Sequence, residues 1–172
     1  MKQTMYLAFS GLMMICAGLT LFFSDQLGVQ TSKIVMPICM VLAGIGSFLF
    51  SKHKELPKVA NQYHMAQGVG LIIYGVIVGS SVNSLESFLL TTTYFIVAYG
   101  LFELLFAFTV LSSKHKINKR ILMSRLIAGA VNLIGGFILL MATMDNVMDG
   151  LLTASILVIL GGISLLVFSR RI

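Results

Sequence analysis

The chain has 172 residues, of which 58% are apolar and only 10% are charged, and its mean hydropathy is strongly positive. Too few polar residues remain to cover a water-soluble globule of this size, so the composition excludes an ordinary soluble domain and favours a protein embedded in a bilayer. The formal net charge of +6 does not indicate nucleic acid as a partner, because the cations lie in short clusters between apolar runs. No Pro-, Ser- or Gly-rich linker divides the sequence, so we expect one domain over residues 1–172.

Six apolar runs are long enough to cross a hydrocarbon core, which takes roughly 17–25 residues each. They are approximately Met5–Phe23, Ile34–Phe50, His64–Val82, Phe88–Leu111, Ile121–Thr143 and Leu151–Phe168. The strands of a membrane barrel would alternate apolar and polar residues, which these runs do not. The first run is too long for a signal peptide and lacks a cleavage pattern, so we expect it to be retained. The sequence therefore predicts an all-α membrane protein with six transmembrane helices, the second bent at Pro37.

The chain also repeats itself. Residues 11–51 and 129–169 carry the same pattern 118 positions apart without a gap, and a middle copy lies between them. The shared glycines are Gly11, Gly18 and Gly44 in the first copy, Gly68, Gly75 and Gly100 in the second, and Gly129, Gly136 and Gly162 in the third. The repeat units cover approximately residues 5–54, 62–116 and 121–171, with two helices each. Such units are related by rotation about the membrane normal, which predicts three parallel hairpins with pseudo-threefold symmetry.

The repeated glycines predict how the helices pack. A seven-residue spacing returns to nearly the same helix face, and small residues let helices approach closely in lipid. We therefore expect the first, third and fifth helices to use these faces against neighbouring helices. Gly75 and Gly79 add a GxxxG element to the third helix.

The cationic residues predict the orientation, because short cytoplasmic loops retain Lys and Arg. On one side of a six-helix zigzag lie Lys2, Lys52, Lys54, Lys58, Lys114, Lys116, Lys119, Arg120, Arg125, Arg170 and Arg171. Only Lys33 falls on the other side, together with most of the acids. We therefore expect both termini in the cytoplasm and the basic clusters on anionic lipid headgroups.

Glu103 is the one acid well inside a predicted membrane helix, about ten residues from its basic end. Such a group is costly in lipid and marks a candidate site, usually with a partner. Arg125 enters the bilayer from the same edge and is the predicted partner, and His64 holds the position of Arg125 in the middle repeat. Asn132, and also Gln67, are further polar residues at membrane depth, where an interhelical hydrogen bond is their simplest role. The pair has two interpretations: an ion pair that pins two helices, or a carboxylate that responds to protons.

Enzyme chemistry has no sequence support. The chain has no nucleophile elbow, no phosphate-binding loop, no zinc spacing and no intramembrane pair of acids. Cys16 and Cys39 lie within predicted helices without the spacing of metal ligands. We therefore expect no catalytic activity, no cofactor and no metal.

The three hairpins resemble the HdeD-like acid-resistance membrane proteins of bacteria. The resemblance covers almost the whole chain and is strongest in the second unit, at Gly75 and Val76, at Tyr94 and Phe95, and at residues 100–104, which read Gly, Leu, Phe, Glu and Leu. It implies a bacterial plasma-membrane protein linked to stress or acid tolerance. It carries over no catalytic residues.

Three functional hypotheses follow. The leading one is a non-enzymatic plasma-membrane protein with a stress or acid-resistance role. The second is a small transporter or channel for protons or a small solute, with a path along the symmetry axis or between hairpins. The third is a membrane scaffold or assembly factor, held by its glycine faces and basic loops. A homo-oligomer or a membrane-protein partner is compatible with each of them.

Overall fold

The computed structural model describes residues 4–52, 58–112, 119–142 and 146–170 of the chain. The described residues form an all-helical structure, as predicted. The helices are α1 (Thr4–Phe22), α2 (Ser24–Phe50), α3 (Lys58–Ser81), α4 (Leu85–Ser112), α5 (Lys119–Met141) and α6 (Val147–Ser169). Six helices in the described part of the chain are long and apolar enough to cross a membrane. These features confirm the predicted class and suggest a multi-pass membrane protein.

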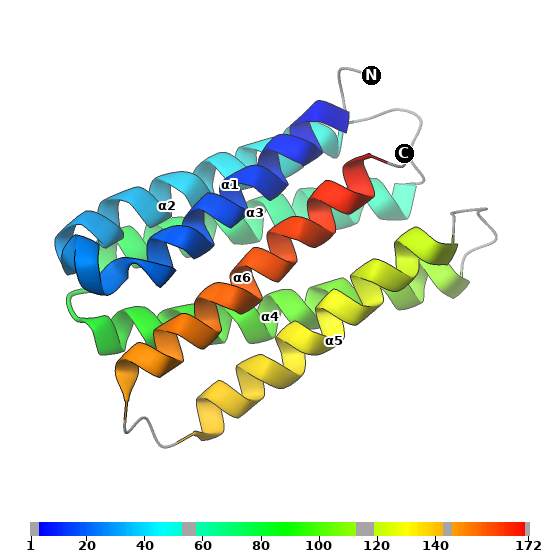
Figure 1. Cartoon of the computed structure of the whole chain (residues 1–172). Coiled ribbons are helices and arrows are strands. Elements are labelled where there is room, and N and C mark those ends of the chain that lie inside the picture. The colour runs from blue at the N-terminus through cyan, green and yellow to red at the C-terminus, as the bar shows by residue number, and fades with distance from the viewer. Residues whose placement is uncertain (1–3, 53–57, 113–118, 143–145, 171–172) are drawn as a thin grey trace.

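The helices run up and down along a common direction in one elongated bundle (Figure 1). α1, α3 and α5 begin at the end of the bundle where α2, α4 and α6 finish, and we call this the basic end. At the opposite end lie the α1–α2 turn, the α3–α4 connection and the beginning of α6. Of the predicted basic residues, Lys2, Lys54, Lys114, Lys116 and Arg171 lie outside the described residues, as does Thr143 at the predicted end of the fifth helix.

The hydropathy pattern placed several helix starts too late, most of all in α2. This helix begins at Ser24 rather than near Ile34, because its first turns are polar and do not belong to the apolar run. They are set at an angle by Gly28, whose φ of 74° lies in the left-handed region that glycine tolerates. The break in α2 is therefore at Gly28, and the backbone keeps helical angles at Pro37.

A similar correction applies to α6, which begins at Val147 rather than Leu151. Asn146 caps the helix by accepting a hydrogen bond from the backbone N–H of Met148 at 3.1 Å, and Asp149 lies in the first turn. Both residues suit a helix N-terminus, where backbone donors lack partners within the helix. A count of apolar residues does not register such polar starts.

Three pairs of glycines form close backbone contacts between helices. A Cβ on Gly11 would stand 2.7 Å from the backbone oxygen of Gly162, so α1 touches α6 directly. The same relation joins α2 to α3 and α4 to α5, with Cβ-to-oxygen distances of 2.6 Å at Gly44 and 2.8 Å at Gly100. Their partners are Gly68 and Gly129. Any side chain at these positions would push the backbones apart.

The second set of predicted glycines is less uniform. Gly18, Gly75 and Gly136 face α6, α2 and α4, with Cβ contacts below 3.0 Å to side chains of those helices. Gly79 would meet only the Pro37 side chain at an ordinary 3.6 Å. The GxxxG element of α3 therefore has one close contact, at Gly75, and not two.

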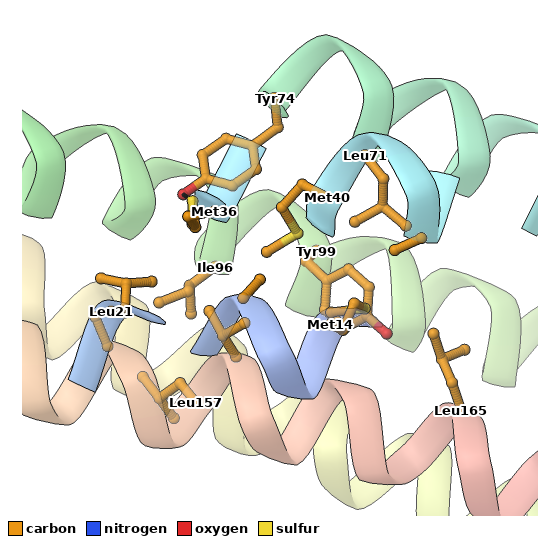
Figure 2. Close-up of a cluster of buried hydrophobic side chains, with 14 of the residues drawn as sticks. Met14, Leu21, Met36, Met40, Leu71, Tyr74, Ile96, Tyr99, Leu157 and Leu165 are labelled. Carbon is orange, nitrogen blue, oxygen red and sulfur yellow. Dashed lines mark hydrogen bonds between the residues drawn. The ribbon is translucent and has the colours of Figure 1, made fainter. Parts of the chain in front are cut away.

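The interior of the bundle is filled by apolar side chains from all its helices. Figure 2 shows Met14, Met40 and Leu71 meeting between the helices, with Tyr99 and Leu165 beside them. All five are buried. The described core is therefore closely packed along the middle of the bundle, and its buried charges, Glu103 and Arg125, lie toward the basic end.

Candidate functional site

Glu103 of α4 and Arg125 of α5 form a bidentate ion pair in the interior. The Nε and one terminal nitrogen of Arg125 donate to the two carboxylate oxygens of Glu103 at 2.7 Å and 2.6 Å. Both side chains have an exposed fraction of 0%. The planar guanidinium matches the carboxylate in this parallel geometry, which makes the contact stronger and more directional than a Lys pair would be. The predicted partnership of these two residues is thus present in the structure.

Aromatic rings enclose the guanidinium on its remaining sides. Its central carbon lies 4.6 Å from the ring centroid of Phe106, 4.7 Å from that of Phe168 and 5.0 Å from that of Tyr63. A cation over an aromatic face is attracted by about 2 kcal/mol or more when desolvated. Tyr63 belongs to α3, Phe106 and Glu103 belong to α4, and Phe168 belongs to α6. Arg125, which lies on α5, therefore links four helices.

His64 joins the centre through Gln67. The amide oxygen of Gln67 accepts a hydrogen bond from Nδ1 of His64 at 3.2 Å. The Gln67 nitrogen donates to the Tyr99 hydroxyl at 3.2 Å and, more weakly, to Glu103 at 3.5 Å. The histidine does not touch the ion pair in these contacts. Its ring packs instead among Phe50, Phe106 and Phe168, with centroid distances of 4.8 Å to 5.8 Å.

Asn132 lies apart from this centre. It is two turns further along α5, and its side-chain nitrogen is 3.5 Å from where a Cβ on Gly161 of α6 would stand. Its side-chain oxygen is buried and has no hydrogen-bond partner among the described residues. The interhelical hydrogen bond expected for Asn132 is therefore not made by this atom.

Several polar atoms near the ion pair also lack partners within the described ranges. They are Nε2 of His64, the second terminal nitrogen of Arg125 and the hydroxyl of Ser164. Buried polar atoms without partners cost about 1–3 kcal/mol each. The centre is therefore well paired around the carboxylate and incompletely paired at the imidazole and at the second terminal nitrogen of the guanidinium.

Repeat position explains why these residues meet. His64 and Arg125 each precede the first glycine of their unit, Gly68 or Gly129, by four residues, which places them on the glycine face. The three phenylalanines around them follow Gly44, Gly100 and Gly162 by six residues each: Phe50, Phe106 and Phe168. Sequence reasoning did not identify these rings or Tyr63 and Tyr99. The recurring phenylalanine was the available signal.

The arrangement can hold a charge pair, but it offers little else chemically. No group of three His, Cys, Asp or Glu side chains gathers in the described part of the chain. Each carboxylate oxygen of Glu103 already accepts a hydrogen bond from Arg125. No protein-family model, curated protein or solved structure matches this chain in the three comparisons made.

Proposed function

We propose that the protein spans the bacterial plasma membrane as three related hairpins around a pseudo-threefold axis, with both termini in the cytoplasm. The three Gly–Gly contacts support this arrangement, because each joins the second helix of one unit to the first helix of the next. The three equivalent phenylalanines beside His64 support it as well. The basic end would then face the cytoplasm, where Lys and Arg meet anionic headgroups.

Within this membrane protein, the function we propose is a non-enzymatic role in acid or stress tolerance that depends on the Glu103–Arg125 pair. The observation that carries it is the complete burial of both charges. Loss of the Glu103 charge would leave the Arg125 charge uncompensated among Tyr63, Phe106 and Phe168, and among the described residues His64 and Tyr99 are the other ionisable groups beside it. The charge state of the pair is therefore coupled to the packing of four helices. An HdeD-like role remains a prediction from the sequence resemblance.

The test is survival of cells at low pH. Cells carrying Glu103→Gln are expected to survive acid challenge at least tenfold less well than wild type at equal protein abundance. Glu86→Gln is the matched control, because it removes an exposed acid from the same helix. Wild-type survival of the Glu103→Gln strain would overturn the proposed role of the pair.

A second variant separates function from folding. Replacing both charges, as in Glu103→Gln with Arg125→Met, removes the unpaired cation that destabilises the single variant. If the pair serves only as a structural pin, this double variant should survive acid like wild type. The proposal expects it to fold and yet remain acid-sensitive.

A small transporter for protons is the second candidate, favoured by the hydrogen-bonded series His64, Gln67 and Glu103. It predicts that protein in liposomes dissipates a pH gradient faster than empty vesicles and that Gln67→Leu slows it. A third candidate, a scaffold or assembly factor, predicts instead a co-purifying membrane protein.

A further inference from the structure

A groove runs between α3 and α4, and its lining comes from these two helices alone. Its inner part, about 120 Å³, adjoins Gln67, and its outer part, about 460 Å³, continues toward the α3–α4 connection. We call it the α3–α4 groove; its extent is marked by Ala66, Gly70 and Ile77 on α3 and by Thr91, Phe95 and Phe102 on α4. The side chains at its lip are strongly exposed, Ile73 at 53% and Tyr94 at 60%.

The groove exists because α3 and α4 carry larger residues than α1 and α2 do at the corresponding positions. In the first hairpin, Ser10 and Ser47 share a hydrogen bond of 3.1 Å, and a Cβ on Gly46 would stand 2.8 Å from the backbone oxygen of Tyr6. At the same distances from the repeated glycines, the second hairpin has Gln67, Glu103 and Phe102. α1 and α2 accordingly touch along much more of their length than α3 and α4.

Gly70 keeps the groove open at its middle. It lines both the inner and the outer part, and a Cβ there would meet nothing within 4 Å. This sets it apart from Gly68, two residues earlier, whose Cβ would stand 2.7 Å from the backbone oxygen of Gly44. Gly70 therefore serves no helix contact in this bundle, and its lack of a side chain leaves free space.

The dimensions of the groove fit one hydrocarbon chain. From Ala66 to Ile77, α3 rises about 16 Å at 1.5 Å per residue, close to the roughly 15 Å depth of one leaflet's hydrocarbon. The volume of the inner part, about 120 Å³, equals that of about four groups the size of a water molecule, at about 30 Å³ each.

A cation lies at the α3–α4 connection, toward which the outer part of the groove continues. Lys33 of α2 donates to the side-chain oxygen of Asn83, in the α3–α4 connection, at 3.4 Å. It forms no ion pair with any acid in the described ranges, so its ammonium group has further donors to offer. Exposed hydroxyls of Ser80 and Ser84 lie at the same end. Lys33 can therefore donate to a phosphate at this end, which also carries the exposed acids Asp25 and Glu86, whereas the groove itself has no charged lining residue.

We propose that the α3–α4 groove binds one acyl chain of a glycerophospholipid whose phosphate is held at Lys33. The chain end reaches Gln67 and Tyr99 and covers them on the lipid side. The inference rests on the proposed membrane orientation, which places the mouth in the outer leaflet. It is independent of the acid-tolerance role, because neither Glu103 nor Arg125 lines the groove.

Photolabelling tests the proposal directly. Purified protein is placed in vesicles that contain phosphatidylglycerol with a diazirine in one acyl chain, and labelled residues are located by mass spectrometry. Label on α3 and α4 at the groove should saturate and be competed by unlabelled phosphatidylglycerol. Label elsewhere on the lipid-facing surface should rise in proportion to the probe. Groove label that also rises without saturation would overturn the proposal.

Variants sharpen this test. Gly70→Phe fills the groove and should lower groove labelling at least fivefold, while Val76→Phe, an exposed position of α3 outside the lining, should leave it unchanged. Lys33→Gln should lower labelling by the phospholipid about threefold but not labelling by a diazirine diacylglycerol, which has no phosphate. Wild-type labelling of folded Gly70→Phe would exclude the groove as the site.

Discussion

Arg125 is the largest fully buried side chain among the described residues, and its environment determines how much the polar centre contributes to stability. Its charge is balanced by Glu103 and covered by three rings. Removing a charge from water costs several kcal/mol, so a buried pair adds little net stability compared with apolar residues of the same volume. Removing one partner is strongly destabilising, since the remaining buried charge then has no compensation.

This asymmetry predicts the behaviour of single and double variants. Glu103→Gln should lower the free energy of unfolding by about 3–5 kcal/mol, because it leaves the Arg125 cation buried and unpaired. The double variant Glu103→Gln with Arg125→Met should recover most of that loss. Thermal unfolding of the purified proteins in detergent measures both. A double variant as unstable as the single one would mean that the pair, and not the orphaned cation, supplies the stability.

The sequence predicted the pair but not its surroundings. Glu103 and Arg125 could be matched because both are charged residues at a similar depth in adjacent helices, where a lone charge is very costly. The enclosing rings of Tyr63 and Phe168 come from helices whose rotation about their axes is set by packing, and a membrane helix is apolar on most faces. Hydropathy therefore does not reveal which aromatic residue turns inward.

At the level of the helices, contact depends on glycine backbones touching without side chains between them. A Cβ on Gly100 would stand 2.5 Å from the backbone nitrogen of Leu133, which can move only if α5 moves. Gly70, on the neighbouring helix α3, faces open space. The same substitution can therefore be made at a position with a helix contact, Gly100, and at one without, Gly70.

Alanine at these two positions should have opposite effects. Gly100→Ala should destabilise the protein by about 1–3 kcal/mol through overpacking, whereas Gly70→Ala should be neutral or stabilise it by up to about 1 kcal/mol, the helix propensity difference. Thermal unfolding in one detergent compares them. Equal destabilisation by both substitutions would show that the contact with Leu133 is not responsible.

The helices themselves were largely predictable, and their ends were not. Apolar runs identify membrane helices because lipid requires long apolar segments with internally bonded backbones. The polar first turns of α2 and the Asn146 cap of α6 lie outside that requirement. The turn at Gly28 depends on one positive φ, which a sequence pattern does not distinguish from any other glycine.

On the scale of the whole molecule, the repeat units pair the helices in one way and the Gly–Gly contacts pair them in another. Covalent hairpins join α1 to α2 and α3 to α4, but the Gly–Gly contacts join α2 to α3, α4 to α5 and α6 to α1. The contact of α6 with α1 brings the last helix against the first and closes the bundle (Figure 1). The contacts between units are extensive, whereas α3 and α4 touch along only a small part of their length.

The orientation of this closed bundle can be tested at the two ends of α3. Lys58 and Ser81 are both exposed and lie at opposite ends of that helix. In a protein whose Cys16 and Cys39 are replaced by Ala, Ser81→Cys should react with a membrane-impermeant maleimide in intact cells. Lys58→Cys should react only after permeabilisation, because the proposed orientation places the basic end in the cytoplasm. The reverse pattern would place the basic end outside, and labelling of both in intact cells would mean that α3 does not cross the membrane.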